Sequence, residues 1–259
     1  MKPTTHKTVT RLAIELCLDR LSLEMQEMIN QDSVVQGSAD EDTKNLIQRA
    51  TNWHFYRAID SPIPKIYKRF GIKCKPTSKD ILEQRIAEML AEKDKKRFYN
   101  RLGRVLHHIQ DMSTPSHVLP IYHGPIKKDY FEDFMEKNDC QITIKRLDPL
   151  AISNRGGDLV NIYEEAAKDC LKNVLKVDLP INERPYRMFW KHYTEHENSK
   201  IAGFGVYGSA HRYFKKLPKD NKYNMTKESL FNIQDTVTDH AIFNTCRALI
   251  YAVGRDKIE

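Results

Sequence analysis

Apolar residues recur every three to four positions along most of this chain, and this spacing constrains its fold more than any other feature. Residues 6–30 show it first, at Val9, Leu12, Leu16 and Leu21. Such spacing gathers apolar side chains on one face of an α-helix. We predict helices at about 6–30, 42–53, 78–92, 95–112, 127–138, 158–176, 183–198 and 226–253. Nothing in the pattern favours a parallel sheet, so the predicted fold class is all-α, a multi-helix bundle formed by residues 1–259 as a single domain.

Between these helices the sequence predicts connections of several kinds. Pro62 and Pro64 indicate a loop, and the glycine-rich residues 203–214 indicate a long irregular connection. Residues 140–147 are compatible with either a short strand or an extended loop. Ser78 is the expected N-cap of the helix that follows it.

Composition places the chain among soluble globular proteins, with 40% hydrophobic and 30% charged residues in a length of 259. No uninterrupted apolar run approaches the ~18 residues that a membrane helix needs, so we expect no transmembrane segment. Charged residues are spread over the first thirty positions, which excludes the apolar core of a signal peptide. We expect a secreted or periplasmic protein if Met1 replaces a removed signal peptide, and otherwise an intracellular one.

The chain carries a net charge of +7, from 42 Lys and Arg against 35 Asp and Glu. This balance favours phosphate-bearing partners, although scattered charges of this kind also occur on any soluble surface. The five cysteines are odd in number and widely spaced, without a CxxC pair. Cysteine therefore predicts neither a redox site nor a metal site.

Histidine is the residue type that points to chemistry. Four of the ten histidines, His107, His108, His117 and His123, lie within seventeen residues together with Asp111. His107 and Asp111 are four residues apart, so on a helix their side chains share a face and can bind the same ion. Neutral imidazole and carboxylate are a ligand set suited to zinc. The cluster therefore predicts a zinc site.

This segment, with its spacing HxxxDxxxxxH, resembles the zinc-dependent phospholipases C of bacteria and the related fungal single-strand nucleases, which share one all-α fold with three zinc ions. The resemblance extends to further motifs in the family's order: His6, GSADED at 37–42, NWHFY at 52–56, PxH at 115–117 and DYFEDF at 129–134. By motif it covers roughly residues 1–136. Beyond them it rests on helical character alone.

The resemblance implies about three zinc ions, each with its own ligands. The first would be held by Asp42, His54, His107 and Asp111, the second by Asp111, His6 and the amine and carbonyl of Met1, and the third by His117, His123 and Glu132. Asp111 would bridge the first two ions, and a hydroxide between them is the expected nucleophile. Asp111 and Asp42 are thus the candidate catalytic residues, Asp42 either as a ligand or as a general base.

The chain departs from the family pattern at two positions. Members of the family usually begin with a Trp whose α-amine binds zinc, whereas Met1 stands here. They also pair a histidine with a carboxylate four residues later, whereas Lys128 stands four residues before Glu132. His123 must then supply that ligand from the preceding loop, and Asp129 remains a rival of Glu132.

Asp42 is preferred over its neighbours Asp40 and Glu41 because it lies five residues after Gly37, as the family pattern requires. The remaining histidines are assigned structural or surface roles: His108, His192, His196, His211 and His240.

Phospholipase C activity, which releases phosphocholine and diacylglycerol, is the first functional hypothesis, because the histidine segment looks closer to the bacterial lipase branch. A single-strand nuclease or 3′-nucleotidase is the second, and the +7 charge supports it. The third is a non-catalytic, zinc-stabilised binding module. We expect a monomer acting on phospholipid at a membrane surface, with nucleic acid as the alternative substrate. Phe55 and Tyr56, with the acidic Asp40 and Glu41, are candidates for a choline pocket.

Overall fold

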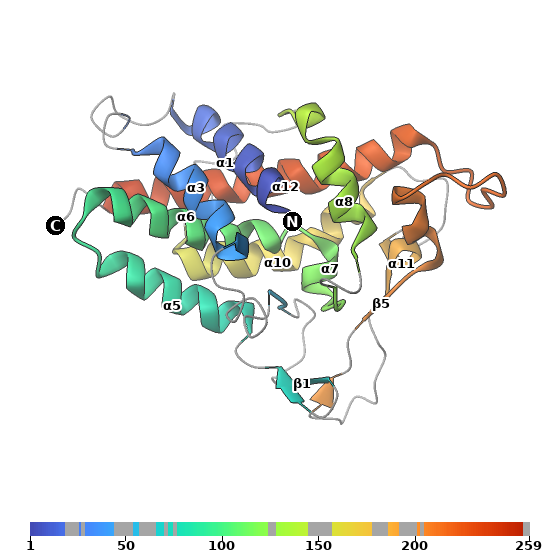
Figure 1. The fold of residues 1–259 in the computed structure, drawn as a ribbon, viewed down its shortest axis with the longest axis horizontal. Coiled ribbons are helices and arrows are strands. Elements are labelled where there is room, and N and C mark those ends of the chain that lie inside the picture. Colours follow the sequence, from blue (N-terminus) through green and yellow to red (C-terminus); the bar gives the residue numbers. More distant parts are fainter. Residues whose placement is uncertain are drawn as a thin grey trace.

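In the computed structural model, long helices lie side by side along the longest dimension of the molecule (Figure 1). The structure describes residues 1–18, 26, 29–43, 54–56, 66–69, 72–74, 77–123, 128–144, 157–177, 186–191, 201–202 and 205–255. The α-helices are α1 (Pro3–Leu18), α3 (Gln31–Thr43), α5 (Ser78–Leu90), α6 (Lys95–Asp111), α7 (Pro115–Val118), α8 (Tyr130–Lys137), α10 (Leu159–Leu175), α11 (Tyr186–Phe189) and α12 (Lys227–Arg255). Helices of the 3-10 type are η1 (Asp139–Gln141) and η2 (Ser209–Phe214).

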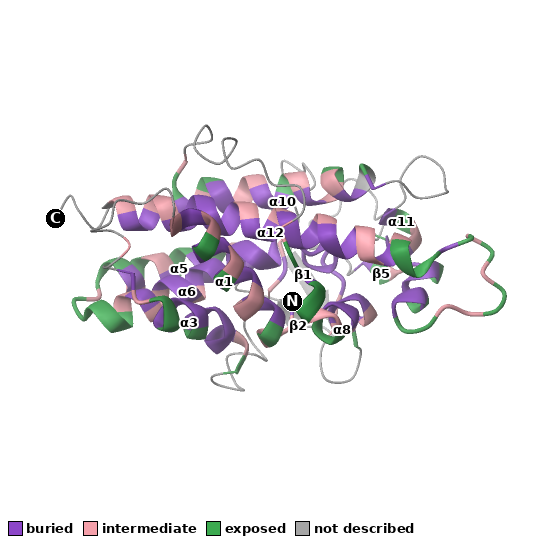
Figure 2. Cartoon of the chain, turned by 90° about the horizontal axis from the view of Figure 1, so that it is seen from above, coloured by how far each residue is buried: buried purple, intermediate pink, exposed green. Residues whose placement is uncertain are grey.

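The apolar faces of the helices meet in a buried cluster around α12. Helices α1, α10 and α6 pack against α12, and α6 also packs against α3 and α5. Val9 and Ala13 of α1, Ile162 of α10 and Ala241 of α12 all belong to this cluster. Figure 2 shows the buried positions lying along the inner faces of the helices. The predicted all-α fold class is confirmed.

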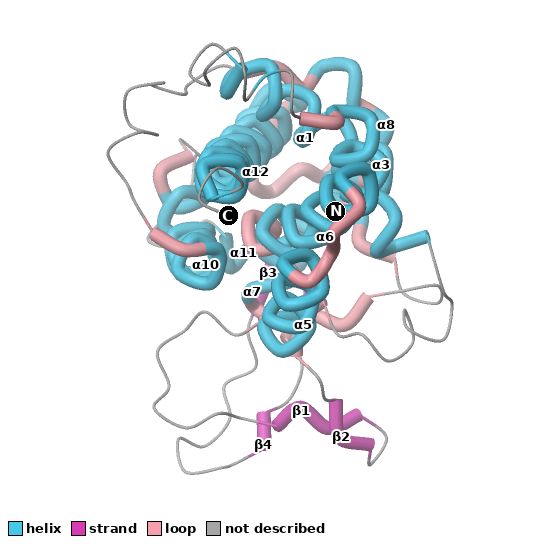
Figure 3. Tube along the Cα trace, turned by 90° about the vertical axis from the view of Figure 1, so that its left-hand side faces the viewer, coloured by secondary structure: helices cyan, strands magenta, loops and turns pink. Residues whose placement is uncertain are grey.

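Two short sheets accompany the helices. β1 (Ile66–Arg69) pairs with β2 (Ile72–Cys74) in antiparallel and with β4 (Ile201–Ala202) in parallel orientation. β3 (Trp190–Lys191) pairs with β5 (Val206–Tyr207) in antiparallel orientation. Figure 3 shows the three-stranded sheet standing apart from the helices. The parallel pairing of β1 with β4 has a register of only two residues, too short to leave a periodic signal in the sequence.

Several predicted helices agree closely with the structure: α5, α6, α10 and α12 begin and end within about two residues of their predicted bounds, the usual scatter of helix ends. The prediction of a helix at 42–53 was wrong in its start, because residues 42–43 are instead the end of α3, and residues 44–53 lie outside the described ones. Helix α3 was missed because its buried face includes polar side chains such as Ser33 and Ser38.

Other segments form a different type of secondary structure from the one predicted. Within 183–198, the described residues form α11 and β3, and within 203–214 they form β5 and η2. The segment 140–147 includes the end of η1, and its residues 145–147 lie outside the described ones, as do Pro62 and Pro64. Thr77, rather than Ser78, caps α5, because its side chain accepts from the Asp80 amide while its own amide donates to the Asp80 carboxylate.

Two glycines let α3 and α6 approach closely. A Cβ on Gly37 would lie 2.0 Å from the Asn100 carbonyl oxygen, and a Cβ on Gly103 would lie 2.1 Å from the Val34 carbonyl oxygen. Real Cβ atoms do not approach backbone so closely, so only glycine fits at both positions. The crossing brings Ser38 and the end of α3 over the last turn of α6.

Candidate metal centre

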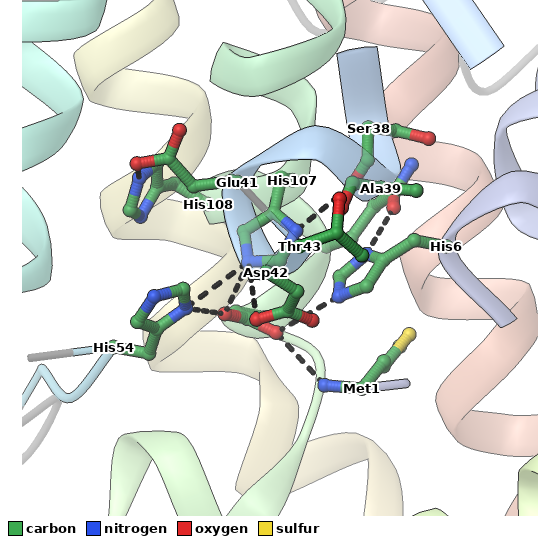
Figure 4. A network of polar contacts seen from close by, with 12 residues as sticks. Met1, His6, Ser38, Ala39, Glu41, Asp42, Thr43, His54, His107 and His108 are labelled. Atoms are coloured by element: carbon green, nitrogen blue, oxygen red, sulfur yellow. Dashed lines mark hydrogen bonds and ion pairs between the residues drawn. The ribbon is translucent and has the colours of Figure 1, made fainter. Parts of the chain in front are cut away.

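The candidate metal centre is built on the last turn of α6, where His107 and Asp111 lie buried. Met1 and His6 reach it from the start of the chain and from α1, and Asp42 reaches it from the end of α3. Figure 4 shows His6, Asp42, His54, His107 and the amine of Met1 pointing toward one another. Segments more than a hundred residues apart in sequence thus supply one cluster.

Each of the two carboxylate oxygens of Asp111 faces a different set of possible metal ligands. Its Oδ1 lies 2.9 Å from the Met1 amine nitrogen and 3.4 Å from His6 Nε2. Its Oδ2 lies 2.9 Å from His54 Nδ1 and 3.2 Å from His107 Nε2. Asp42 Oδ1 lies 3.9 Å from the same His107 nitrogen. One carboxylate therefore faces two sets of nitrogen and oxygen donors at once.

A third set of donors lies between α7, the segment after it and α8. His117 Nε2 is 2.9 Å from Glu132 Oε1, and His123 Nε2 is 3.4 Å from the same oxygen. Glu132 also lies 3.2 Å from the Met1 amine, which connects this set to the other two. Asp129, the rival of Glu132, lies outside this donor group, and its Oδ1 accepts from His211 Nε2 at 2.9 Å and from the first amides of α8.

Four of the histidines, His6, His107, His117 and His123, are held by hydrogen bonds of their Nδ1 atoms. His107 Nδ1 lies 2.9 Å from the Ser38 carbonyl oxygen, and His123 Nδ1 lies 2.8 Å from that of Ile121. His117 Nδ1 and His6 Nδ1 have corresponding partners in the His54 carbonyl oxygen and Gln110 Oε1. An outer N–H donated to a fixed oxygen selects the tautomer whose other nitrogen is a lone-pair ligand.

Burial and charge act in opposite directions on the amine of Met1. Burial lowers its pKa, but the Asp111 and Glu132 carboxylates outweigh burial and raise it to about 11. The ammonium form thus places a positive charge between two buried acids. A role as a metal ligand requires the neutral amine, so binding an ion there would release a proton.

His6 and His107 stack with their ring centroids 4.0 Å apart, and their pKa values diverge. Burial and the neighbouring positive charge of His107 lower the pKa of His6 to about 4. Burial also disfavours protonated His107, but Asp111 and Asp42 outweigh it and raise its pKa to about 9. Two stacked imidazoles cannot both be protonated at neutral pH at low cost.

The donor set fits zinc. Each of the groups His6, His107 and Asp111; Asp42, His54 and His107; and His117, His123 and Glu132 has its ligand atoms within 4.8 Å of one another. His6 Nε2 is buried and has no hydrogen-bond partner among the described residues. Zinc is usually bound by imidazole nitrogens and carboxylate oxygens whose other polar atoms are held by hydrogen bonds.

The three adjacent acids near the end of α3 point in different directions. Asp40 accepts hydrogen bonds from Gln36 and Asn100, and Glu41 accepts from Arg85 and Arg104 at 2.8 and 2.6 Å. Only the third acid, Asp42, belongs to a metal group. The expectation that Asp40 and Glu41 form an acidic choline pocket was wrong, because both carboxylates are buried in these contacts.

The aromatic candidates for that pocket also pack inwards. Phe55 is 8% exposed and lies against the rings of His117 and His123. Tyr56 is half-buried and packs edge-on against Tyr163.

The histidines assigned to structural roles behave in different ways. His108 Nδ1 lies 3.1 Å from Ser78 Oγ, and its Nε2 faces Glu41. His211 is buried and bonded to Asp129, and His240 is half-buried on α12. His192 and His196 lie outside the described residues.

Sequence reasoning missed the residues that hold the ligands. Gln110 holds His6, the Ser38 carbonyl holds His107, and Arg85 and Arg104 hold Glu41 next to Asp42. Backbone carbonyls carry no residue signal, so Ser38 could not have been found. Gln110, a buried amide beside a predicted ligand on the same helix, is a signal that could have been used.

The sequence matches no protein-family model, and no curated protein is significantly similar to it. Among solved structures, it is similar to the alpha-toxin of Clostridium perfringens, isolated from avian strain SWCP. The TM-score is 0.58 at 14% sequence identity, over 97% of this chain and 63% of the toxin chain. The chain thus spans less than two thirds of the toxin's length. The resemblance inferred from sequence motifs is thus confirmed at the level of the fold.

Proposed function

We propose that this chain is a zinc-dependent phosphoric diester hydrolase of the phospholipase C type, acting on phosphatidylcholine-like lipid. The observation that carries the proposal is the position of Asp111, whose two oxygens face two separate groups of donors. A carboxylate shared in this way is typical of two-metal sites that hydrolyse phosphate esters.

The proposed ligands form three sets. The first is Asp42, His54, His107 and Asp111 Oδ2; the second is Met1, His6 and Asp111 Oδ1; the third is His117, His123 and Glu132. Zinc ions bound there, about three in all, would neutralise charge on the phosphate and lower the pKa of bound water.

The substrate would enter at the least buried edge of the centre. The side chains of Asp42, His54 and His123 are 18%, 14% and 13% exposed, whereas those of His6, His107 and Asp111 are at most 1% exposed. At this edge the Asp42 carboxylate can accept a proton from the attacking water. Water adds to phosphorus, the bond from phosphorus to the glycerol oxygen breaks, and that oxygen takes up a proton.

Lipid is preferred to nucleic acid as substrate because the histidine segment at 107–123 looks closer to the bacterial lipase branch; the fold is shared with the nucleases and does not separate the two. The donor groups alone do not separate the two substrates, since both are phosphodiesters cleaved by attack of water on phosphorus. The headgroup contacts must come from residues other than Asp40 and Glu41, which are engaged within the fold.

The test measures zinc content and product release on the same preparation. We expect about three zinc ions per chain, release of phosphocholine and diacylglycerol from phosphatidylcholine, little cleavage of single-stranded DNA, and loss of activity on chelation. Asp111→Asn should abolish activity and remove two ions together, whereas Asp169→Asn, the same change on α10, should alter neither. One zinc ion or none in the folded wild type would refute the metal assignment. DNA cleavage without phosphocholine release would replace lipid by nucleic acid as the substrate.

A further inference from the structure

A second concave site lies beside α8, on a face of that helix different from the one that carries Glu132. It is a cavity of about 480 Å³ between α8 and η2, and three lysines line it: Lys128, Lys137 and Lys215. Tyr130, Asp133, Phe134 and Lys137 have the spacing of one helix face, so the cavity runs along one side of α8. We refer to the space lined by Lys128, Tyr130, Asp133, Phe134, Lys137, Phe214 and Lys215 as the lysine cavity.

The charge within the lysine cavity is positive. Its one acidic side chain among the described lining residues, Asp133, is paired with Lys2 at 3.2 Å. Lys215 Nζ lies 5.3 Å from the centroid of the Tyr130 ring, so its ammonium stands over an aromatic face. A cavity of this composition favours an anion with several oxygen acceptors, such as a phosphate ester.

The chain next to the cavity adds more positive charge. Residues 209–227 contain six basic side chains, all exposed, and a single acidic one, Asp220. The loop that follows η2 projects from one end of the molecule, on the side of α8 (Figures 1 and 2). This segment therefore carries a formal charge of +5 beside the cavity.

We propose that the lysine cavity and the basic residues of segment 209–227 dock the protein on an acidic phospholipid surface. The cavity would take the phosphate of one lipid headgroup. The inference rests on the proposed function, since a phospholipid substrate is what brings the protein to such a surface. Long lysine stems and tyrosine rings suit the boundary between water and lipid, where the charge stays in the headgroup layer.

The cavity fits a lipid headgroup better than a single-stranded nucleic acid. Nucleic-acid grooves offer a series of open aromatic faces on which successive bases stack. Here Phe134 and Phe214 are 8% and 5% exposed, and Lys215 covers the Tyr130 ring.

Sedimentation with lipid vesicles tests the proposal, using the zinc-loaded protein. The variant K128Q/K137Q/K215Q is compared with K93Q/K95Q/K96Q, which makes the same change of charge at exposed lysines near the start of α6. The connection between α5 and α6 lies at the opposite end of the molecule from the loop after η2 (Figure 1). The vesicles contain phosphatidylcholine, alone or with about one third phosphatidylserine.

Each lysine close to an acidic surface contributes roughly fivefold to binding, so the cavity variant should lose on the order of a hundredfold in affinity for phosphatidylserine vesicles at low salt. The control variant should lose only a few-fold, through net charge. Equal losses in the two variants, or no loss in the cavity variant, would overturn the proposal. A loss of single-stranded DNA binding without a loss of vesicle binding would also overturn it, in favour of nucleic acid. If millimolar inorganic phosphate alone protected the three lysines from acetylation while vesicles did not, the cavity would be a site for free phosphate.

Sedimentation measures binding without catalytic turnover, so the docking proposal and the proposed activity can be refuted independently. Vesicle binding through the cavity without phosphocholine release would preserve the docking site and refute the proposed activity. If the protein hydrolysed soluble short-chain phosphatidylcholine while the two variants bound vesicles equally well, the proposed activity would stand and the docking site would be refuted.

Discussion

Gly103→Ala tests whether the close crossing of α3 and α6 holds the metal centre in place. The added Cβ would lie 2.1 Å from the Val34 carbonyl oxygen and 2.7 Å from the Ser38 amide nitrogen. Both neighbours are backbone atoms, so no side chain can rotate away. An ordinary contact begins at 3.4 Å, and the helices must therefore part by about 1.3 Å.

Overpacking of this kind costs about 1–3 kcal/mol of folding free energy, while alanine in a helix recovers about 0.5–1 kcal/mol relative to glycine. The expected net loss is about 1–2 kcal/mol, which for a chain of this size lowers the melting temperature by about 2–4 °C per kcal/mol. The movement also draws the Ser38 carbonyl away from His107 Nδ1, now at 2.9 Å. Loss of such an outer contact weakens metal binding by about tenfold or more.

The assay is urea unfolding in the presence of chelator, together with zinc affinity measured by competition. Gly254→Ala is the matched control, because that glycine also lies in a helix and a Cβ there meets nothing within 4 Å. It should leave stability unchanged or raise it slightly. Wild-type stability in Gly103→Ala, or an equal loss in Gly254→Ala, would refute the reasoning.

Other parts of the structure give further predictions. Glu41→Gln should cost about 3–5 kcal/mol in urea unfolding, because it removes the buried charge that buried Arg85 and half-buried Arg104 share, whereas Glu88→Gln, which changes an Arg85 partner that is 32% exposed, should cost under about 1 kcal/mol; similar losses would contradict this. A short extension before Met1 turns its buried amine into an amide, so zinc content and activity should fall and return when the extension is cleaved off; equal zinc content in both forms would show that the amine is not a ligand. Burial raises the pKa of the Cys170 thiol, so mass spectrometry after alkylation of the folded protein should find Cys140, which is exposed, modified long before Cys170; early modification of Cys170 would contradict its burial.

The long helices could be predicted from the sequence because their apolar residues repeat over many turns. Helix α6 is the clearest case, since Leu102, Val105, Leu106 and Ile109 lie on its buried side and lead directly to His107. Helix α3 lacks such a repeat, because its packing depends on glycine contacts with α6 and on buried polar side chains. Local periodicity cannot show that two backbones will approach this closely.

The candidate site was predictable only in part for a similar reason. The i, i+4 spacing of His107 and Asp111 indicates a shared helix face, but nothing local in sequence brings His6 or Met1 to that face. Those positions came from the resemblance to a family. The separation of Asp42 from Glu41 depends on arginines of two other helices, which a single segment does not reveal.

The three donor groups also differ in what holds them. His107 and Asp111 stand on the 17-residue helix α6, whose last turn is buried. Glu132 stands on the eight-residue α8, whose N-cap is Asp129, and the Asp129 carboxylate is fixed by buried His211. The His211 ring in turn stacks on Tyr207 at 3.9 Å. A short helix depends on such tertiary contacts for its position far more than a long one does. Glu132 of the third group is therefore positioned by the Asp129 and His211 pair, while the shared carboxylate of the first two groups is positioned by the core of the bundle.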